Sequence, residues 1–253
     1  MSQRRDGVLR EIGLAPLWKL RAAHAVAPSP AAAAADSSPA PATAEMPPEE
    51  VGRAAAIAGM NWDELRQSTA SCRACELCRT RQQAVLGVGD LQADWLFVGE
   101  GPGAEEDKKG EPFVGQAGQV LDAMLAAIGL RRGERVYIAN AVKCRPPDNR
   151  TPEPAEIAAC RPYLERQIEL LRPKLIVALG RPAAQVLLDR DVKIAALRGT
   201  LLDYRGVPLV VSYHPAYLLR TPSDKARAWE DLCFARATFL QREGLQRDPS
   251  ATI

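Results

Sequence analysis

The segment WLFVGEGPGAEEDKKGEPFVGQAG, residues 95–118, holds the signals that decide the fold. Its first part, Trp95 to Gly99, is apolar without alternation, which predicts a short strand buried on both faces. A glycine-rich loop follows, and from Gln116 to Ile128 the apolar residues recur at helical spacing. A buried strand, a loop and a helix in this order are typical of a layered α/β domain.

The same alternation continues along the chain. A helix is expected around 51–70, before the first strand. Four strands separated by helices predict a mostly parallel sheet between helical layers. The further strands are expected at Arg135–Ala139, Lys174–Leu179 and Pro208–Ser212, and the further helices at 154–171, 182–188 and 224–240.

Polar residues stand where these strands end. Glu100, Asn140 and His214 each follow the apolar run of a predicted strand. In an open α/β sheet the ligand crevice lies beyond the carboxyl ends of the strands, so we expect these side chains to converge. His214 is the one imidazole placed to act there, since the other histidine, His24, precedes the expected folded domain.

The composition limits the classes of function. A length of 253 residues excludes a mini-protein, and a net charge of +2 means that contact with nucleic acid would need local clustering of basic residues. No apolar run is long enough to span a membrane, and the N-terminus lacks a signal-peptide pattern. We therefore expect a soluble, cytoplasmic protein.

The chain divides by composition into four parts. Residues 1–22 form a short amphipathic peptide, and residues 23–50 are rich in proline and alanine, which predicts a disordered linker. Residues 51–241 are expected to form the folded domain, and residues 242–253 a flexible tail.

Three of the six cysteines, Cys72, Cys75 and Cys78, are spaced three residues apart. Cys144 and Cys160 follow the second strand, so thiolates from both segments could bind one structural zinc ion or an iron–sulfur cluster. Buried apolar cysteines are the alternative, and Cys233, alone on the last helix, is interpreted as a small core residue.

The loop from Gly99 to Ala104 matches a loose dinucleotide-binding pattern, G-x-G-x-x-A. The acidic residues 105–107 would repel a pyrophosphate, and the helix is expected only from Gln116, so this interpretation is disfavoured. A tight glycine-rich turn without chemistry is the structural alternative.

Three motifs, GEGPGAEEDKKGEPFVGQAG (99–118), NAVKCRPPDNRTP (140–152) and HPAYLLR (214–220), resemble in this order those of the family 4 uracil-DNA glycosylases. The resemblance spans about Ser71 to Leu240. It implies a three-layer α/β sandwich around a parallel four-stranded sheet. It also implies a [4Fe–4S] cluster on Cys72, Cys75, Cys144 and Cys160, with Cys78 competing with Cys75 as a ligand.

The resemblance assigns roles to residues near the strand ends. Phe113 should stack on uracil, Asn140 should read its amide edge, and His214 should face its O2 atom. Glu100 and Gly101 stand where other members of the superfamily carry glutamine and a water-activating aspartate, so the catalytic base is left open. Ala104 replaces a glutamate common in the family.

The implied substrate is uracil in single-stranded or double-stranded DNA, flipped out of the stack by a monomeric, monofunctional enzyme. Glu106 is assigned to the exclusion of thymine. An iron–sulfur redox protein or a noncatalytic nucleic-acid-binding module is the competing class. The residues expected to contact DNA are Pro215, Leu218, Leu219 and Arg220.

The N-terminal peptide carries an apolar stripe that includes Leu17 and Trp18 between basic residues. Residues 5–21 are similar to the N-terminal peptide of the bacterial replicase psi subunit, which docks on its chi partner. The resemblance implies recruitment to a chi-type clamp-loader subunit through a flexible tether. Packing of the same residues on the folded domain is the alternative.

Overall fold

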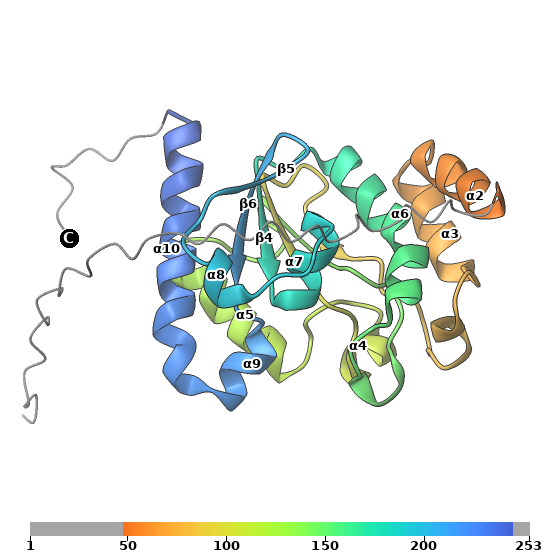
Figure 1. The fold of residues 1–253 in the computed structure, drawn as a ribbon, viewed down its shortest axis with the longest axis horizontal. Coiled ribbons are helices and arrows are strands. Elements are labelled where there is room, and N and C mark those ends of the chain that lie inside the picture. The colour runs from red at the N-terminus through yellow and green to blue at the C-terminus, as the bar shows by residue number, and fades with distance from the viewer. Residues whose placement is uncertain (1–47, 245–253) are drawn as a thin grey trace, which may run out of the picture. The chain divides into compact units, whose positions relative to one another are not determined.

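The computed structural model describes residues 48–244, which form a mixed sheet between two layers of helices (Figure 1). The strand order is β1-β3-β2-β4-β6-β5. The four inner strands run parallel, as the sequence predicts. The strands are β1 (Val88–Gly89), β2 (Trp95–Gly99), β3 (Val136–Asn140), β4 (Leu175–Leu179), β5 (Leu202–Tyr204) and β6 (Val207–Ser212).

The inner strands form the core because both of their faces are covered. Every residue of β2, β3 and β4 is buried, which is the pattern of a parallel sheet with helices on each side. Trp95 lies beside Val136 of β3 and Leu175 of β4, so these three strands start in register. Their carboxyl ends consequently reach the same edge of the sheet.

The two edge strands were not expected. β1 pairs with β3 and β5 pairs with β6, both antiparallel. They contain two and three residues, which is too short for a periodic sequence signal.

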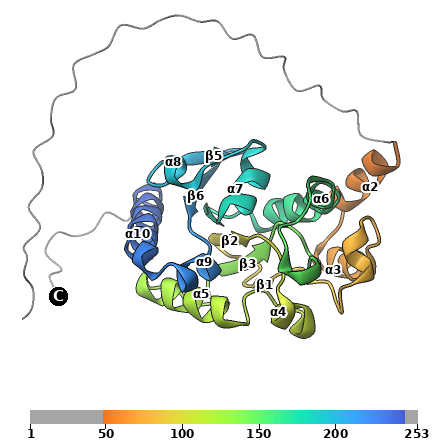
Figure 2. The same ribbon diagram turned by 60° about the horizontal axis from the view of Figure 1, so that its bottom comes forward.

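The helices separate into two layers, and this confirms the three-layer sandwich. Leu96 and Val98 of β2 pack with residues of α6 (Pro154–Leu171) and α7 (Arg181–Leu188). On the other face, Trp95 and Phe97 pack with residues of α5 (Gln116–Ala127) and α10 (Lys225–Arg242). Figure 2 shows the strands between these layers.

The helix predicted over 51–70 is wrong, because the structure has two helices there. They are α2 (Pro48–Ala58) and α3 (Trp62–Ser71). Asn61 begins the second helix, since its Oδ1 atom accepts hydrogen bonds from the backbone N–H groups of Asp63 and Glu64. The Glu64 carboxylate accepts from the Asn61 N–H in return, completing a capping box that helical periodicity alone does not reveal.

The predicted boundaries also need correction at both ends of the domain. Because α2 begins at Pro48, the linker expected over 23–50 is too long. The peptide 1–22 and most of the linker lie outside the described residues, as does most of the tail. Three short helices were missed, namely α4 (Ala104–Lys109), α8 (Ile194–Leu197) and α9 (Pro215–Arg220).

None of the helices within residues 48–244 combines the length and apolar character required to cross a bilayer.

Candidate active site

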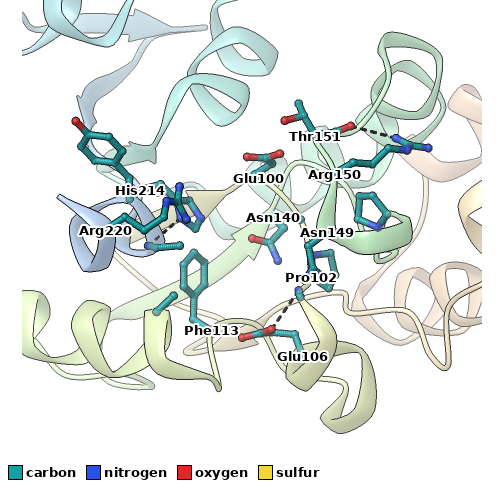
Figure 3. A pocket seen from close by; sticks show the side chains of 16 residues that line it. Glu100, Pro102, Glu106, Phe113, Asn140, Asn149, Arg150, Thr151, His214 and Arg220 are labelled. Carbon is teal, nitrogen blue, oxygen red and sulfur yellow. Dashed lines mark hydrogen bonds between the residues drawn. The ribbon is translucent and has the colours of Figure 1, made fainter.

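A cavity of about 440 Å³ opens at the carboxyl ends of the parallel strands. Glu100 follows β2, Asn140 ends β3 and His214 follows β6, and all three line this cavity (Figure 3). The convergence expected from the strand ends is therefore confirmed. The other lining residues are Gly101, Pro102, Gly103, Glu106, Phe113, Ala117, Pro146, Asn149, Arg150, Thr151, Ala216, Tyr217 and Arg220.

Asn140 presents an unpaired acceptor to the cavity. Its side chain is buried, and its Oδ1 atom has no hydrogen-bond partner among the described residues. Its backbone carbonyl accepts a hydrogen bond of 2.8 Å from the buried Lys143 ammonium, which fixes the end of β3. A buried amide held in this way is suited to read a ligand that offers an N–H group.

His214 is held as a neutral hydrogen-bond donor. It caps α9, where its Nδ1 atom accepts a hydrogen bond of 3.2 Å from the Ala216 backbone N–H. The ring proton is therefore on Nε2. Burial, with a smaller contribution from Arg220, lowers the pKa of His214 to about 4, so the imidazole is neutral at pH 7.

Phe113 forms an apolar wall in an unusual backbone conformation. Its ring is buried, and the ring centroid lies 5.5 Å from that of His214. Its φ angle is 55°, in the left-handed region that bulky residues rarely occupy. Such a conformation costs on the order of 1–3 kcal/mol and persists only where the surroundings enforce it.

Glu106 connects the two loops that shape this wall. One carboxylate oxygen accepts from the backbone N–H groups of Val114 and Gly115, at 3.0 and 3.1 Å. The other accepts from the Gly103 N–H at 3.1 Å. The carboxylate thus fastens the backbone after Phe113 to the glycine-rich loop.

The expectation that the glycine-rich loop continues without a helix to Gln116 is wrong, because α4 starts directly after Gly103. The N-terminus of this helix is nevertheless occupied by its own residue Glu106. An acidic side chain already at this position leaves a pyrophosphate group no favourable contact. The dinucleotide interpretation therefore stays disfavoured, for a different reason.

Glu100 and Gly101 supply very different groups to the cavity. Burial raises the pKa of the Glu100 carboxyl, opposed by a hydrogen bond from Thr151. Gly101 has no room for a side chain, because a Cβ atom there would lie 2.8 Å from a methyl carbon of Val142. An aspartate at position 101 would therefore clash with Val142 in this structure.

The residues expected to contact DNA separate by exposure. Pro215 and Leu218 are buried, and Leu218 belongs to the core below α9. Leu219 and Arg220 are exposed at the end of the same helix. Of the two leucines, only Leu219 has an exposed side chain.

A loop not assigned a role from sequence forms the opposite wall. Residues 149–151 line the cavity, and the Arg150 guanidinium binds both carboxylate oxygens of Glu156 at 2.8 and 2.6 Å. Glu156 lies in the first turn of α6, so the ion pair ties the cavity wall to that helix. These wall residues belong to the motif 140–152, but their place in the cavity wall depends on tertiary packing.

Five cysteines line one small cavity between α3, α6 and the loop after β3. Two basic residues also line this thiol cavity, Lys143 and Arg81, and Arg81 donates a hydrogen bond of 2.7 Å to the Cys144 sulfur. Neither Arg81 nor Lys143 is assigned a role from the sequence. The five cysteines are Cys72, Cys75, Cys78, Cys144 and Cys160.

The chemistry of the thiol cavity fits a soft, cationic group. Burial raises the pKa of Cys75 and Cys144, and raises that of Cys160 to about 12, so these three thiols favour the protonated form. No carboxylate or imidazole lines this cavity in the described part of the chain. No three potential ligands within residues 48–244 are arranged to hold a single metal ion. Cys233, expected in the core, is instead exposed.

Comparisons with known proteins agree on one family. Residues 86–233 match the model of the uracil DNA glycosylase superfamily. The chain is 48% identical over 177 residues to the type-4 uracil-DNA glycosylase of Thermotoga maritima, covering 68% of this chain and 91% of that protein. It is 46% identical over 168 residues to the type-4 enzyme of Archaeoglobus fulgidus, covering 63% and 84%.

Proposed function

The chain belongs to the type-4 uracil-DNA glycosylases of the uracil DNA glycosylase superfamily, and we propose that it hydrolyses the N-glycosidic bond of deoxyuridine in DNA. The reaction releases uracil and leaves an abasic site for base excision repair. The observation that carries this proposal is the unpaired Oδ1 atom of Asn140, buried beside the Phe113 wall.

The pocket reads a base that has been flipped out of the stack. The Phe113 ring stacks on the pyrimidine, which any pyrimidine would allow. Asn140 then accepts the uracil N3–H at Oδ1 and donates from its amide nitrogen to O4. Cytosine reverses this pattern and leaves buried polar groups unpaired, which supports strong discrimination.

His214 stabilises the departing base. As the bond from C1′ to N1 breaks, negative charge grows on uracil, mainly at O2. The fixed Nε2–H of the neutral imidazole donates a hydrogen bond to this oxygen and needs no change of protonation. A donor oriented in advance in this way lowers the barrier by roughly 2.7–4 kcal/mol.

Glu100 orients the attacking water. Two carboxylates line the cavity, and both oxygens of Glu106 already accept backbone hydrogen bonds. Glu100 accepts a hydrogen bond from Thr151 and keeps acceptor sites with which it can hold a water against C1′, and its raised pKa makes it a better base than an exposed glutamate. Gly101 contributes backbone packing and no base.

Two further contacts define the substrate. Glu106 excludes thymine, since a carboxylate fixed by three N–H groups cannot yield to the 5-methyl group. Arg220 lines the pocket and Leu219 is the exposed residue before it on α9, and both press into the strand and hold the gap left by the flipped base.

The thiol cavity holds a [4Fe–4S] cluster on Cys72, Cys75, Cys144 and Cys160. Four thiolates are the usual ligand set of such a cluster, and these four cysteines line one cavity. When bound, the cluster supplies no chemistry to uracil and connects α3 to the sheet and α6. Arg81 and Lys143 balance the charge of the thiolates.

Residues 5–21 recruit this activity to the replication machinery by docking on a chi-type subunit. These residues lie outside the described part of the chain. Their amphipathic sequence and the proline-rich tether that follows support the proposal. Removal of residues 1–47 should leave uracil release from oligonucleotides unchanged and abolish co-purification with purified chi. Loss of folding on removal would instead place the peptide within the domain.

The central experiment treats single-stranded and double-stranded oligonucleotides that contain one deoxyuridine with the full chain. We expect free uracil and a strand that breaks only in alkali, because no lysine is among the described residues lining the cavity. Strand breakage without alkali would contradict a monofunctional enzyme. No uracil release by folded, iron-loaded protein would overturn the function in favour of a noncatalytic module.

A further inference from the structure

Arg132 is a second side chain, besides Glu106, that binds the backbone of the Phe113 wall. Its Nη1 atom donates to the Pro112 carbonyl and its Nη2 atom to the Phe113 carbonyl, both at 2.9 Å. Two donors of one planar guanidinium therefore grip two consecutive carbonyls. The contact spans the residue whose φ angle is positive.

Asp122 fixes the guanidinium itself. Its Oδ1 atom accepts from Nε of Arg132 at 3.0 Å and from Nη2 at 2.9 Å. Asp122 lies on α5, whereas Arg132 lies in the turn between α5 and β3, so the pair braces the turn against the helix. The Arg132 side chain is only 23% exposed, which limits competition from water.

Helix α5 also packs closely against the backbone of Phe113. A Cβ atom at Gly118 would lie 1.8 Å from the Phe113 carbonyl oxygen, so α5 approaches this peptide as closely as a glycine permits. Arg132 thus binds the carbonyls of Pro112 and Phe113, and Glu106 binds the N–H groups of the next two residues. A conformation that bulky residues avoid is thereby over-determined.

We propose that Arg132, braced by Asp122, is a positioning residue that sets the Phe113 ring for stacking on the flipped base. The proposal rests on the proposed function, because it assigns Arg132 a role only through Phe113. Arg132 touches neither the base nor the sugar, and its side chain is absent from the cavity lining. Its effect on the rate should therefore disappear when the ring it positions is gone.

The test is a double-mutant cycle in single-turnover uracil release. Phe113→Ala should slow the reaction roughly 5- to 150-fold, the worth of one base–aromatic stack. Arg132→Ala should cost less than this, and in the Phe113→Ala background it should have no further effect. Arg131→Ala is the matched control, since Arg131 is 80% exposed and forms an ion pair with the exposed Glu134. It should retain the wild-type rate.

Two further readouts separate positioning from general stability. Arg132→Lys should recover only part of the rate, because one ammonium cannot reproduce the two-carbonyl grip. Binding to DNA with a tetrahydrofuran abasic analogue, which has no base to stack, should be unchanged in Arg132→Ala.

Two outcomes would overturn the role of Arg132, namely an Arg132→Ala defect of equal size in both backgrounds and a wild-type rate in the single variant. Inactive wild-type protein would instead refute the proposed function.

Discussion

The base pocket and the thiol cavity lie along one stretch of chain but are completed in different ways. The loop that leaves Cys144 passes the pocket wall at residues 149–151 and leads into α6, which carries Cys160. In the pocket, protein hydrogen bonds already hold His214 and Glu106 in their working state. In the thiol cavity, burial raises the pKa of Cys144 and Cys160, so the proposed cluster would have to displace their protons when it binds.

This difference teaches which property each region controls. Substitutions in the base pocket should change the chemical step and leave the fold intact. Substitutions of the buried cysteines should change the amount of folded protein and leave the chemistry of the surviving molecules intact. The following predictions test this division.

The largest effect is expected from Cys160→Ser. Cys160 is buried on α6, and loss of its thiolate would remove a proposed cluster ligand, whose binding is coupled to folding. Soluble yield and iron content should fall sharply from about four iron atoms per chain. Uracil release per iron-loaded molecule should stay near the wild-type value. Iron analysis and burst titration measure these quantities.

The matched control for Cys160→Ser is Cys233→Ser, whose side chain is exposed and outside the thiol cavity. It should behave as wild type. A Cys78→Ser variant that loses iron while Cys75→Ser keeps it would exchange the two ligands. Full zinc loading in place of iron would reject the cluster.

His214→Ala should be the most damaging change in the pocket. Loss of one fixed donor to a developing anion costs roughly 10²- to 10³-fold in the chemical step. Single-turnover uracil release under saturating enzyme measures it. Iron content should be unchanged, since His214 lies outside the thiol cavity. An unaffected rate would remove His214 from the mechanism, and lost iron would break the division between the two regions.

Asn140→Asp should change specificity. A carboxylate cannot donate to O4, so uracil release should fall roughly 5- to 150-fold, the cost of a buried unpaired group. A protonated aspartic acid offers the reversed pattern, so some release of cytosine should appear. Parallel assays on uracil- and cytosine-containing strands check both effects. Unchanged preference for uracil would show that another residue reads the base.

The smallest effect is expected from pH. His214, with its pKa lowered to about 4, stays neutral through the ordinary histidine range, so its titration should produce no inflection between about pH 5.5 and 8. Any acid limb should come from Glu100, whose raised pKa means that activity falls as pH falls through it. Glu100→Gln should remove that limb from the pH–rate profile. An inflection near 6.5 lost in His214→Gln would contradict a neutral donor.

The pH dependence of stability has a definite sign. The pKa of His214 is lower in the folded chain than in the unfolded chain, so between about pH 6.5 and 4 the unfolded state binds the additional proton. This contribution to the free energy of unfolding is therefore present above pH 6.5 and declines as pH falls. His214→Gln should abolish this part of the denaturation profile.

The four inner strands and the helices between them could be predicted from the sequence, because buried strands and helical periodicity are local signals. It located Glu100, Asn140 and His214 at one edge, since parallel strands align their ends. It could not give the break at Asn61, which depends on side-chain capping, or the edge strands, which are too short for a pattern. Nor could it show that Leu218 is buried, because only the packing of α9 against the core decides which of two adjacent leucines faces outward.

The Arg132 and Arg150 contacts were invisible for a related reason. Arg132 lies outside the three motifs, and its partner Phe113 is 19 residues away in the sequence. Arg150 lies inside the second motif, but its ion pair with Glu156 depends on tertiary packing. Arginines in a polar loop are common, and only the position of the neighbouring carbonyls and carboxylates distinguishes these two from their exposed neighbours.

The short antiparallel strands at the two margins of the sheet also affect pairing between the sheets of neighbouring molecules. β1 and β5 occupy the backbone hydrogen-bonding groups of β3 and β6, the two outermost apolar strands. A sheet that ended in a long apolar strand would offer a template for strands of another chain. Here each margin offers only two or three residues for such pairing. The fold thereby leaves little free strand backbone for edge-to-edge pairing between molecules.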